Sequence, residues 1–182
     1  MKYVVIVALL FCHAQSYSQG ITRPKKGKAV VYFVRTMSLA FAIDFTYYDS
    51  TKVIGRFNSR NYIRYECEPG EHLFWASASN QDFITAELEA GKIYFVEAVP
   101  SAGVPYAQVF LHPIDPNDKR MEKLDNIINK FTPRTMTESE LANETQTQAA
   151  VISKALEKYQ EELSKGKKKF KRLEKTMFYG HG

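Results

Sequence analysis

The alternation of apolar and polar residues changes character near Asp115. Before this point, short aromatic and β-branched runs lie between turn residues, at spacings of about ten residues, which is typical of strands. These runs cover residues 28–35, 40–48, 52–57, 62–67, 72–79, 82–88, 92–99 and 106–112. No helix-length segment separates these runs, so the chain offers no helical crossover of the kind that joins parallel strands. The pattern predicts an antiparallel β-sandwich of about eight strands over residues 28–114.

After Asp115 the apolar residues recur at helical spacing. Met121, Leu124, Ile128 and Phe131 predict a short helix that packs on the sandwich and ends before Pro133. A second, long C-terminal helix is expected to begin at Thr137, because Thr137 and Glu140 form the pattern of a capping box. Residues 115–182 are therefore predicted to be a helical extension of a mainly β protein.

The long helix carries an apolar stripe with alternating steps of three and four residues, which is typical of a helix that pairs with another surface. That surface is expected to be the β domain of the same chain, a second copy in a homo-oligomer, or nothing if the tail frays. The stripe consists of Ala149, Ile152, Leu156, Tyr159, Leu163, Gly166, Phe170, Leu173 and Met177.

The last part of this stripe overlaps a basic run, residues 165–175, which holds seven Lys and Arg and one acid. A basic amphipathic segment suits an anionic surface, although it also serves as a solubilising end. Nucleic acid is not expected, because residues 28–114 hold 7 Lys/Arg against 9 Asp/Glu. The candidate surface contacts are Lys165, Lys167, Lys168, Lys169, Lys171, Arg172 and Lys175.

Residues 1–18 have the features of a secretory signal peptide: Lys2, the apolar run 3–12 and a polar end with small residues. Ten apolar residues are too few to span a bilayer core of about 30 Å. We expect cleavage after Ser16 or Ser18, leaving residues 19–27 as a basic linker and a protein in the periplasm or cell envelope. An uncleaved anchor and a lipid on Cys12 are the alternatives, and the bulky Phe11 argues against the lipid.

The only Trp and the remaining Cys lie around "EPGE", residues 68–71. Pro69 and Gly70 suit a two-residue turn, so runs 62–67 and 72–79 are expected to pair as a hairpin. This register places Cys67 opposite His72 on an apolar face. It places Arg64 opposite Trp75 on the other face, as a cation–π pair beneath the C-terminal helices or as a ligand site.

An imidazole beside Cys67 could activate the thiol as a nucleophile. The apolar surroundings argue against this role, because burial raises the pKa of a thiol, and no third group is in place to orient His72. The sequence has no nucleophile elbow, no phosphate-binding Gly loop and no Zn-binding spacing of Cys or His. A non-enzymatic protein without metal or cofactor is therefore expected.

Four segments in this order resemble the bacterial domain-of-unknown-function family 2846: "PKKGKAVVYFVR", "DSTKVIG", "PGEH" and "LEAGKIYFVEA". The resemblance covers residues 24–112 and implies a sandwich-like fold in the cell envelope, without an established activity. The helical tail lies outside it.

These observations predict a binding or scaffolding module of the bacterial envelope, whose tail contacts a protein partner, a second copy or an anionic surface. The alternatives are a carbohydrate- or peptidoglycan-binding sandwich that uses an exposed Trp75, and a thiol-dependent enzyme that uses Cys67 and His72.

Overall fold

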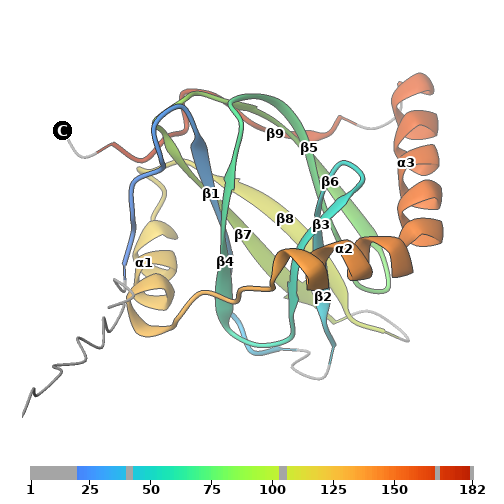
Figure 1. Cartoon of the computed structure of the whole chain (residues 1–182), viewed down its shortest axis with the longest axis horizontal. Coiled ribbons are helices and arrows are strands. Elements are labelled where there is room, and N and C mark those ends of the chain that lie inside the picture. The colour runs from blue at the N-terminus through green and yellow to red at the C-terminus, as the bar shows by residue number, and fades with distance from the viewer. Residues whose placement is uncertain (1–19, 40–42, 103–105, 167–168, 181–182) are drawn as a thin grey trace, which may run out of the picture.

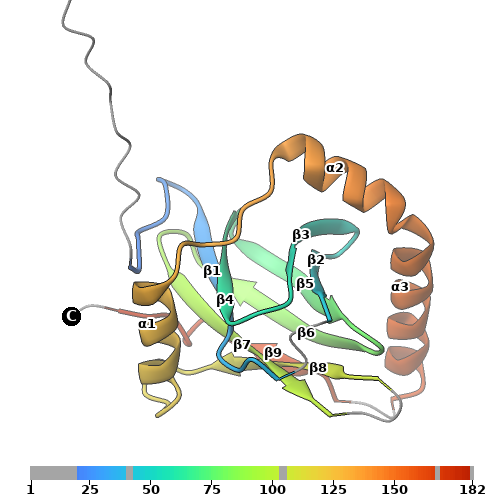
Figure 2. The same ribbon diagram turned by 90° about the horizontal axis from the view of Figure 1, so that it is seen from below.

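The computed structural model describes residues 20–39, 43–102, 106–166 and 169–180. Within these ranges two sheets pack face to face, and helices lie outside them (Figures 1 and 2). The predicted signal peptide, residues 1–18 with Cys12, lies outside the described residues. A mainly β sandwich with a helical extension is therefore confirmed.

Sheet A has four strands and sheet B has five among the described residues. Sheet A has the order β4 (Asn61–Cys67), β1 (Ala29–Arg35), β7 (Ile93–Ser101) and β8 (Gln108–Ile114). Sheet B has the order β3 (Lys52–Phe57), β2 (Phe45–Asp49), β5 (Gly70–Ser77), β6 (Gln81–Leu88) and β9 (Lys171–Leu173).

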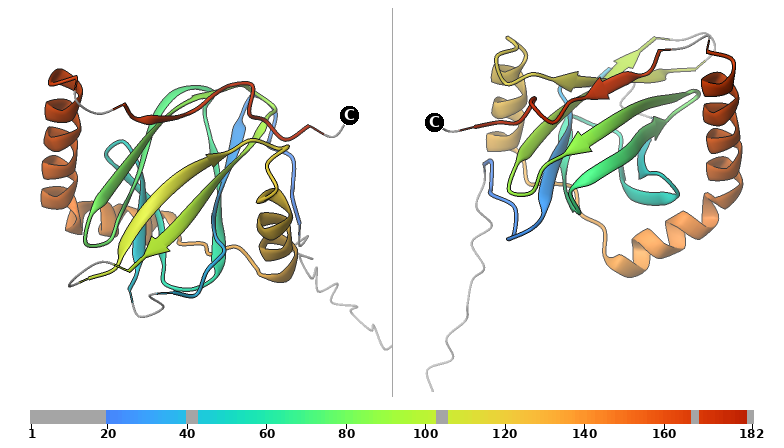
Figure 3. Two further views of the ribbon diagram at one scale, coloured as in Figure 1. Left: turned by 180° about the vertical axis from the view of Figure 1, so that it is seen from behind. Right: turned by 90° about the horizontal axis from the view of Figure 1, so that it is seen from above.

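Three apolar clusters hold the layers together. The first fills the space between the sheets and includes Phe33 and Phe74. The second joins the outer face of sheet A to α1 (Met121–Lys130), and the third joins the outer face of sheet B to α3 (Ala149–Ser164). Figure 3 shows α1 and α3 on opposite sides of the sandwich. The strand β1 is buried on both faces, as its sequence predicts.

The prediction that all strands pair antiparallel is wrong at two places. β1 pairs parallel with β7, and β6 pairs parallel with β9. The chain reaches β7 from β1 through several strands, most of them in sheet B, so these strands serve as the crossover that usually requires a helix.

The expected hairpin around Pro69 and Gly70 is also wrong. β4 belongs to sheet A and β5 to sheet B, so the segment is a corner between the sheets. Gly70 has φ +118°, a conformation that favours glycine, where the chain enters β5. Ile63, Cys67 and Phe74 do face the core between the sheets, as expected, whereas His72 has polar partners. The first three reach the core from opposite sheets rather than from paired strands.

The long C-terminal helix divides into α2 (Glu138–Thr147) and α3, which meet at Gln148. The capping box of Thr137 and Glu140 is confirmed. The prediction that the helix continues to Met177 is wrong: α3 ends at Ser164, and Gly166 follows with φ +59°. Leu173 is then fully buried in β9, which offers it more apolar contact than an exposed helix would.

The apolar stripe of α3 packs on the β domain of its own chain. Ile152 and Tyr159 are buried against Trp75 and Phe83 of sheet B, with Ala155 between them on the same helix face. Of the expected alternatives, packing on the same chain is confirmed for this part of the stripe. Leu163 is 51% exposed, so the stripe ends there.

Replacing Ile152 with alanine should lower the free energy of unfolding by about 2–4 kcal/mol, because the change leaves a cavity under α3. Emission of Trp75, the only Trp, should shift to the red as water reaches it. Denaturant unfolding measures both effects. Leu163→Ala, on the same helix, is the matched control and should cost about 0.5 kcal/mol or less. Equal losses for the two variants would contradict the burial of Trp75 by α3.

Candidate functional site

The corner between β4 and β5 holds a small polar cluster against the edge of the core. Asp49 Oδ2 accepts hydrogen bonds from Tyr65 OH at 3.0 Å and from His72 Nδ1 at 2.9 Å. The other ring nitrogen of His72, Nε2, lies 2.9 Å from the carbonyl oxygen of Glu68. Three elements, β2, β4 and β5, are thereby joined at one point.

These partners determine the charge on His72. A carbonyl oxygen only accepts, so Nε2 donates to Glu68, and Nδ1 donates to the carboxylate of Asp49. A ring that donates from both nitrogens is the imidazolium. The hydrogen bond to Asp49 raises the pKa of His72 above its ordinary value of 6.5, against the opposing effect of burial. The fold therefore favours the protonated ring of His72, which joins the parts of the corner.

The predicted thiol pair is not formed. Cys67 pairs with Ala29 of β1, and both ring nitrogens of His72 are engaged elsewhere. Cys67 is 7% exposed, and burial, followed by the negative charge of Asp49, raises the pKa of its thiol to about 12. A thiol in this state is a poor nucleophile at neutral pH.

The predicted pair of Arg64 and Trp75 is wrong as well, since the two residues lie in different sheets. Arg64 is opposite Tyr32 of β1, and its guanidinium donates to Thr22 Oγ1 at 2.7 Å. Trp75 stacks on Tyr48 with ring centroids 3.6 Å apart and is fully buried. The expectation that helices cover Trp75 is confirmed, and Trp75 cannot serve as an exposed ligand platform.

Much of the basic run is paired inside the molecule. Lys171 contacts Asp82 at 2.8 Å, and Arg172 contacts Glu87 at 2.9 Å. Lys175 lies 3.8 Å from Glu87. These three basic side chains therefore pair with carboxylates of sheet B, so less of their charge is available to an anionic surface.

Two further lysines of the run, Lys165 and Lys169, lie in the described part of the chain. Lys165 pairs with Glu161 one helical turn away, and Lys169 is exposed. Lys167 and Lys168 lie outside the described residues.

The structure brings together another set of residues, which we call the loop end. It consists of the stretches 36–39, 77–81, 101–102 and 106–108, which follow or precede strands at one end of the sandwich, the lower end in Figure 1. The parallel strands β1 and β7 both end here. The Ser79 backbone N–H donates to the Ala107 carbonyl at 3.3 Å, which links two of the loops.

Exposed apolar side chains gather at this end. Among the described residues, five large apolar side chains are exposed: Met37 45%, Leu39 48%, Tyr106 65%, Val151 37% and Leu163 51%. The first three belong to the loop end. Val151 lines a hollow of about 350 Å³ beside it, together with Ile43, Ala78 and the exposed Asp44. Leu163 lies about 18 Å from Val151 along α3, at 1.5 Å per residue.

The loop end also contains no Asp, Glu, Lys or Arg within its described stretches, "TMSL", "SASNQ", "SA" and "YAQ". Two exposed charged residues border it, Arg60 in the turn between β3 and β4 and Asp44 before β2. The opposite end of the sandwich is charged, with Lys28, Glu68, Glu89 and Lys92 in or beside its turns. Uncharged, partly apolar loops rich in Ser, Asn and Tyr are typical of binding surfaces.

Buried polar groups hold the loop after β1. Arg35 is fully buried and donates to the carbonyl oxygens of Met37, Leu39 and Ile43 at 3.3, 2.6 and 3.3 Å. Its guanidinium also lies 4.0 Å from the centre of the Phe45 ring. The buried Arg35 side chain therefore fixes the backbone of this loop.

Thr36 is fixed in a similar way. Its hydroxyl donates to the buried Glu97 carboxylate at 2.6 Å, and Arg120 lies 3.6 Å from the same carboxylate. Exposed side chains on a supported loop are well suited to recognition, because little freedom is lost when they bind.

A larger groove, of about 750 Å³, runs along α3 beside Thr51. Its apolar wall is formed by Ile152, which is buried, and Leu156, which is half-buried. Neither side chain is among the large apolar side chains that are exposed in the described part of the chain.

Among the described residues, no group of three or more His, Cys, Asp or Glu is placed to hold a metal ion. No helix within the described ranges is long and apolar enough to cross a membrane. Comparisons with protein-family models, with curated proteins and with solved structures find no match. The resemblance of residues 24–112 to family 2846 therefore stays a prediction.

Sequence reasoning missed the loop end. The absence of charge in each short stretch is visible in the sequence, but four such stretches attract attention only when the topology places them side by side. Met37 and Leu39 fall between two predicted strands, and Tyr106 was assigned to a strand.

The protonated state of His72 should appear in the pH dependence of stability. A pKa raised by folding adds stability that is fully present below the unfolded value of about 6.5 and is lost as pH rises through the folded value. His72→Gln should therefore cost about 1–2 kcal/mol at pH 5.5, and less at pH 9. Chemical denaturation at several pH values measures this difference.

His112→Gln is the control, because burial lowers the pKa of His112. Compared with the unchanged chain, His112→Gln should therefore lose less stability at low pH than at high pH. If the two variants show the same pH profile, the assignment of a charged His72 is incorrect.

Cys67 should react slowly with a thiol reagent such as DTNB at pH 7.5 in the folded protein and fully after denaturation, because it is buried and protonated. The absorbance of the released thiolate reports the rate, which should rise at least about 100-fold in denaturant, given the raised pKa and the loss of access. Rapid labelling of the folded chain would restore the thiol-enzyme hypothesis.

Proposed function

We propose that this chain is a non-enzymatic binding module, and that the loop end is the surface with which it holds a protein partner. The observation that carries the proposal is the gathering of Met37, Leu39 and Tyr106 on the loop end, whose described stretches hold no charged residue. Exposed large apolar groups cost solubility, so their concentration at one place indicates a use.

The partner that fits is an apolar segment of another protein chain. A nucleic acid or an anionic lipid surface requires several cations, whereas the described stretches of the loop end hold none and the neighbouring turn between β3 and β4 adds Arg60 alone. A thioether, a leucine and a phenol ring instead provide apolar area, while Ser79 and Asn80 provide adaptable hydrogen bonding at the rim. The features of residues 1–18 support a location in the cell envelope for this partner.

Strand addition at β3 or β4 is a less suitable mode of binding, because these two edges are covered. The Val53 backbone N–H of β3 donates to Thr145 Oγ1 of α2 at 3.1 Å. The Tyr62 carbonyl of β4 accepts from the Arg134 backbone N–H at 2.8 Å. Loops, rather than these strand edges, are left to recognise the partner.

The proposal is tested with a phage library of random peptides selected on the full chain. Selected peptides should be apolar and bind with micromolar affinity. Leu39→Asp and Tyr106→Asp should each weaken them at least about 10-fold, because each variant places a charge in the apolar contact. Fluorescence anisotropy with synthetic peptides gives the dissociation constants.

Leu163→Asp is the matched control, because Leu163 is as exposed as Leu39 but lies far from the loop end. It should leave the affinities unchanged. The proposal is wrong if the library yields no binder, or if the binders respond equally to Leu163→Asp and Leu39→Asp.

A further inference from the structure

The C-terminal segment after α3 sits on sheet B as an extended peptide ligand would. Residues Lys171–Leu173 form β9, which pairs parallel with Ile84–Ala86 at the edge of β6. Leu173 is fully buried in the core between the sheets. A strand added at a sheet edge, with one side chain in an apolar pocket, is a common mode of peptide recognition.

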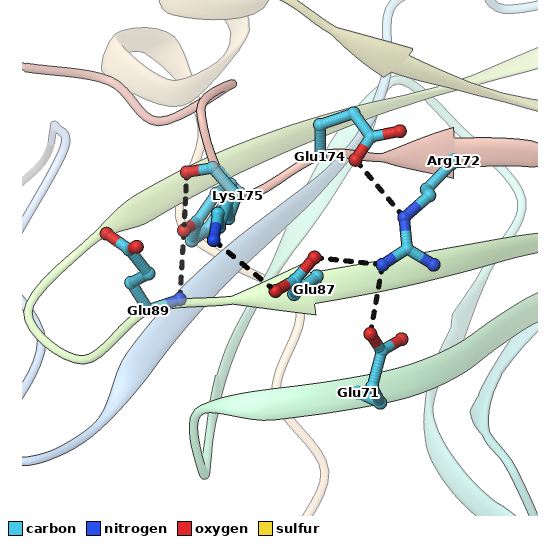
Figure 4. A network of polar contacts seen from close by, with 7 residues as sticks. Glu71, Glu87, Glu89, Arg172, Glu174 and Lys175 are labelled. Atoms are coloured by element: carbon cyan, nitrogen blue, oxygen red, sulfur yellow. Dashed lines mark hydrogen bonds and ion pairs between the residues drawn. The ribbon is translucent and has the colours of Figure 1, made fainter.

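The charges on the two sides are complementary (Figure 4). Arg172 contacts Glu71 of β5 and Glu87 of β6, each at 2.9 Å. Lys175 lies 3.8 Å from Glu87. The site supplies the carboxylates and the segment supplies the bases, so attraction between them specifies a basic strand.

The backbone of the segment is held as well. Tyr94 OH donates to the Lys175 carbonyl at 3.2 Å, and the Tyr179 backbone N–H donates to the Ile93 carbonyl at 2.7 Å. After Ser164, where α3 ends, the chain turns at Lys165 and Gly166, and Gly166 has φ +59°. The segment is therefore bound by contacts of its own and joined to the helix by a turn.

We propose that this edge of sheet B is a recognition site for an extended strand of the pattern basic–basic–apolar, and that it can take the C-terminal segment of a second copy of this chain. The two copies would exchange their segments reciprocally. The second copy is the fitting occupant, because its segment presents the same Lys171, Arg172 and Leu173 to the same carboxylates. The covalent tether favours binding of the chain's own segment at low protein concentration, so we expect exchange between copies only at high protein concentration.

Two full-chain variants test this proposal. The first has a reversed segment, Arg172→Glu with Lys175→Glu. The second has a reversed site, Glu71→Arg with Glu87→Arg. Neither chain can seat its own segment without repulsion. After reciprocal exchange both mismatches disappear, because the unchanged segment meets the unchanged site and the reversed segment meets the reversed site.

We expect each variant alone to be monomeric, and an equimolar mixture at about 100 μM to form a heterodimer, measured by light scattering and by energy transfer between labelled chains. Since the Debye length falls to about 3 Å at 1 M salt, high salt should weaken the heterodimer at least about 10-fold. A mixture that stays monomeric while both variants retain buried Trp75 emission would overturn the proposal. So would a heterodimer of equal strength between either variant and the unchanged chain.

A peptide measurement covers the case in which a variant does not fold. A labelled peptide of residues 169–180 should bind the reversed-segment chain at least about 10-fold more tightly than the reversed-site chain. If either double variant is unfolded, Lys175→Glu and Glu71→Lys replace them, because both side chains are more than half exposed. Equal binding to the two chains, or none to either, would also overturn the proposal.

Discussion

Burial of β1 on both faces is the constraint on which the rest of the structure depends. Phe33 packs between the sheets, while Tyr32 lies under α1. A strand that is apolar on both sides needs a layer above and below, so sheet B and α1 are both required. Sheet B in turn has an outer face with Trp75, and α3 is required to cover it. The order of the layers therefore follows from the burial of one apolar face after another.

The same layering separates the two ends of the sandwich. Turns at one end carry charges that pair with each other and with the N-terminal segment, as Lys25 does with Glu66 at 3.6 Å. At the other end, the described stretches of the loop end carry no charge, with Arg60 in the turn beside them, and the loop after β1 is supported from beneath through Arg35 and Glu97. Buried ions are costly unless their partners are complete, so these two residues are used to fix a shape. The shape they fix is the one that exposes Met37 and Leu39.

The tail shows how tertiary contacts change the meaning of a charge pattern. Read in isolation, residues 165–175 are a basic amphipathic segment suited to an anionic surface. In the fold, Arg172 and Lys171 find carboxylates on β5 and β6, and Leu173 finds the core. A buried leucine contributes about 1.5–3 kcal/mol, more than an exposed ion pair, so apolar burial outweighs helix continuation and the ion pairs select the register.

The sequence by itself determined the elements whose signals are local. Short aromatic and β-branched runs between turn residues identified β1–β8, the spacing of Met121, Leu124 and Ile128 identified α1, and the capping box located the start of α2. It also assigned Cys67 and Phe74 to the core, because side-chain alternation along each strand does not depend on its partner. Only the tertiary structure decided that β4 and β5 lie in different sheets, that the tail ends as β9, and that Met37 and Tyr106 meet at one end. Those outcomes depend on which distant segments bury the most apolar surface together. The residues of a single segment do not contain that information, because it depends on all the alternative pairings in the chain.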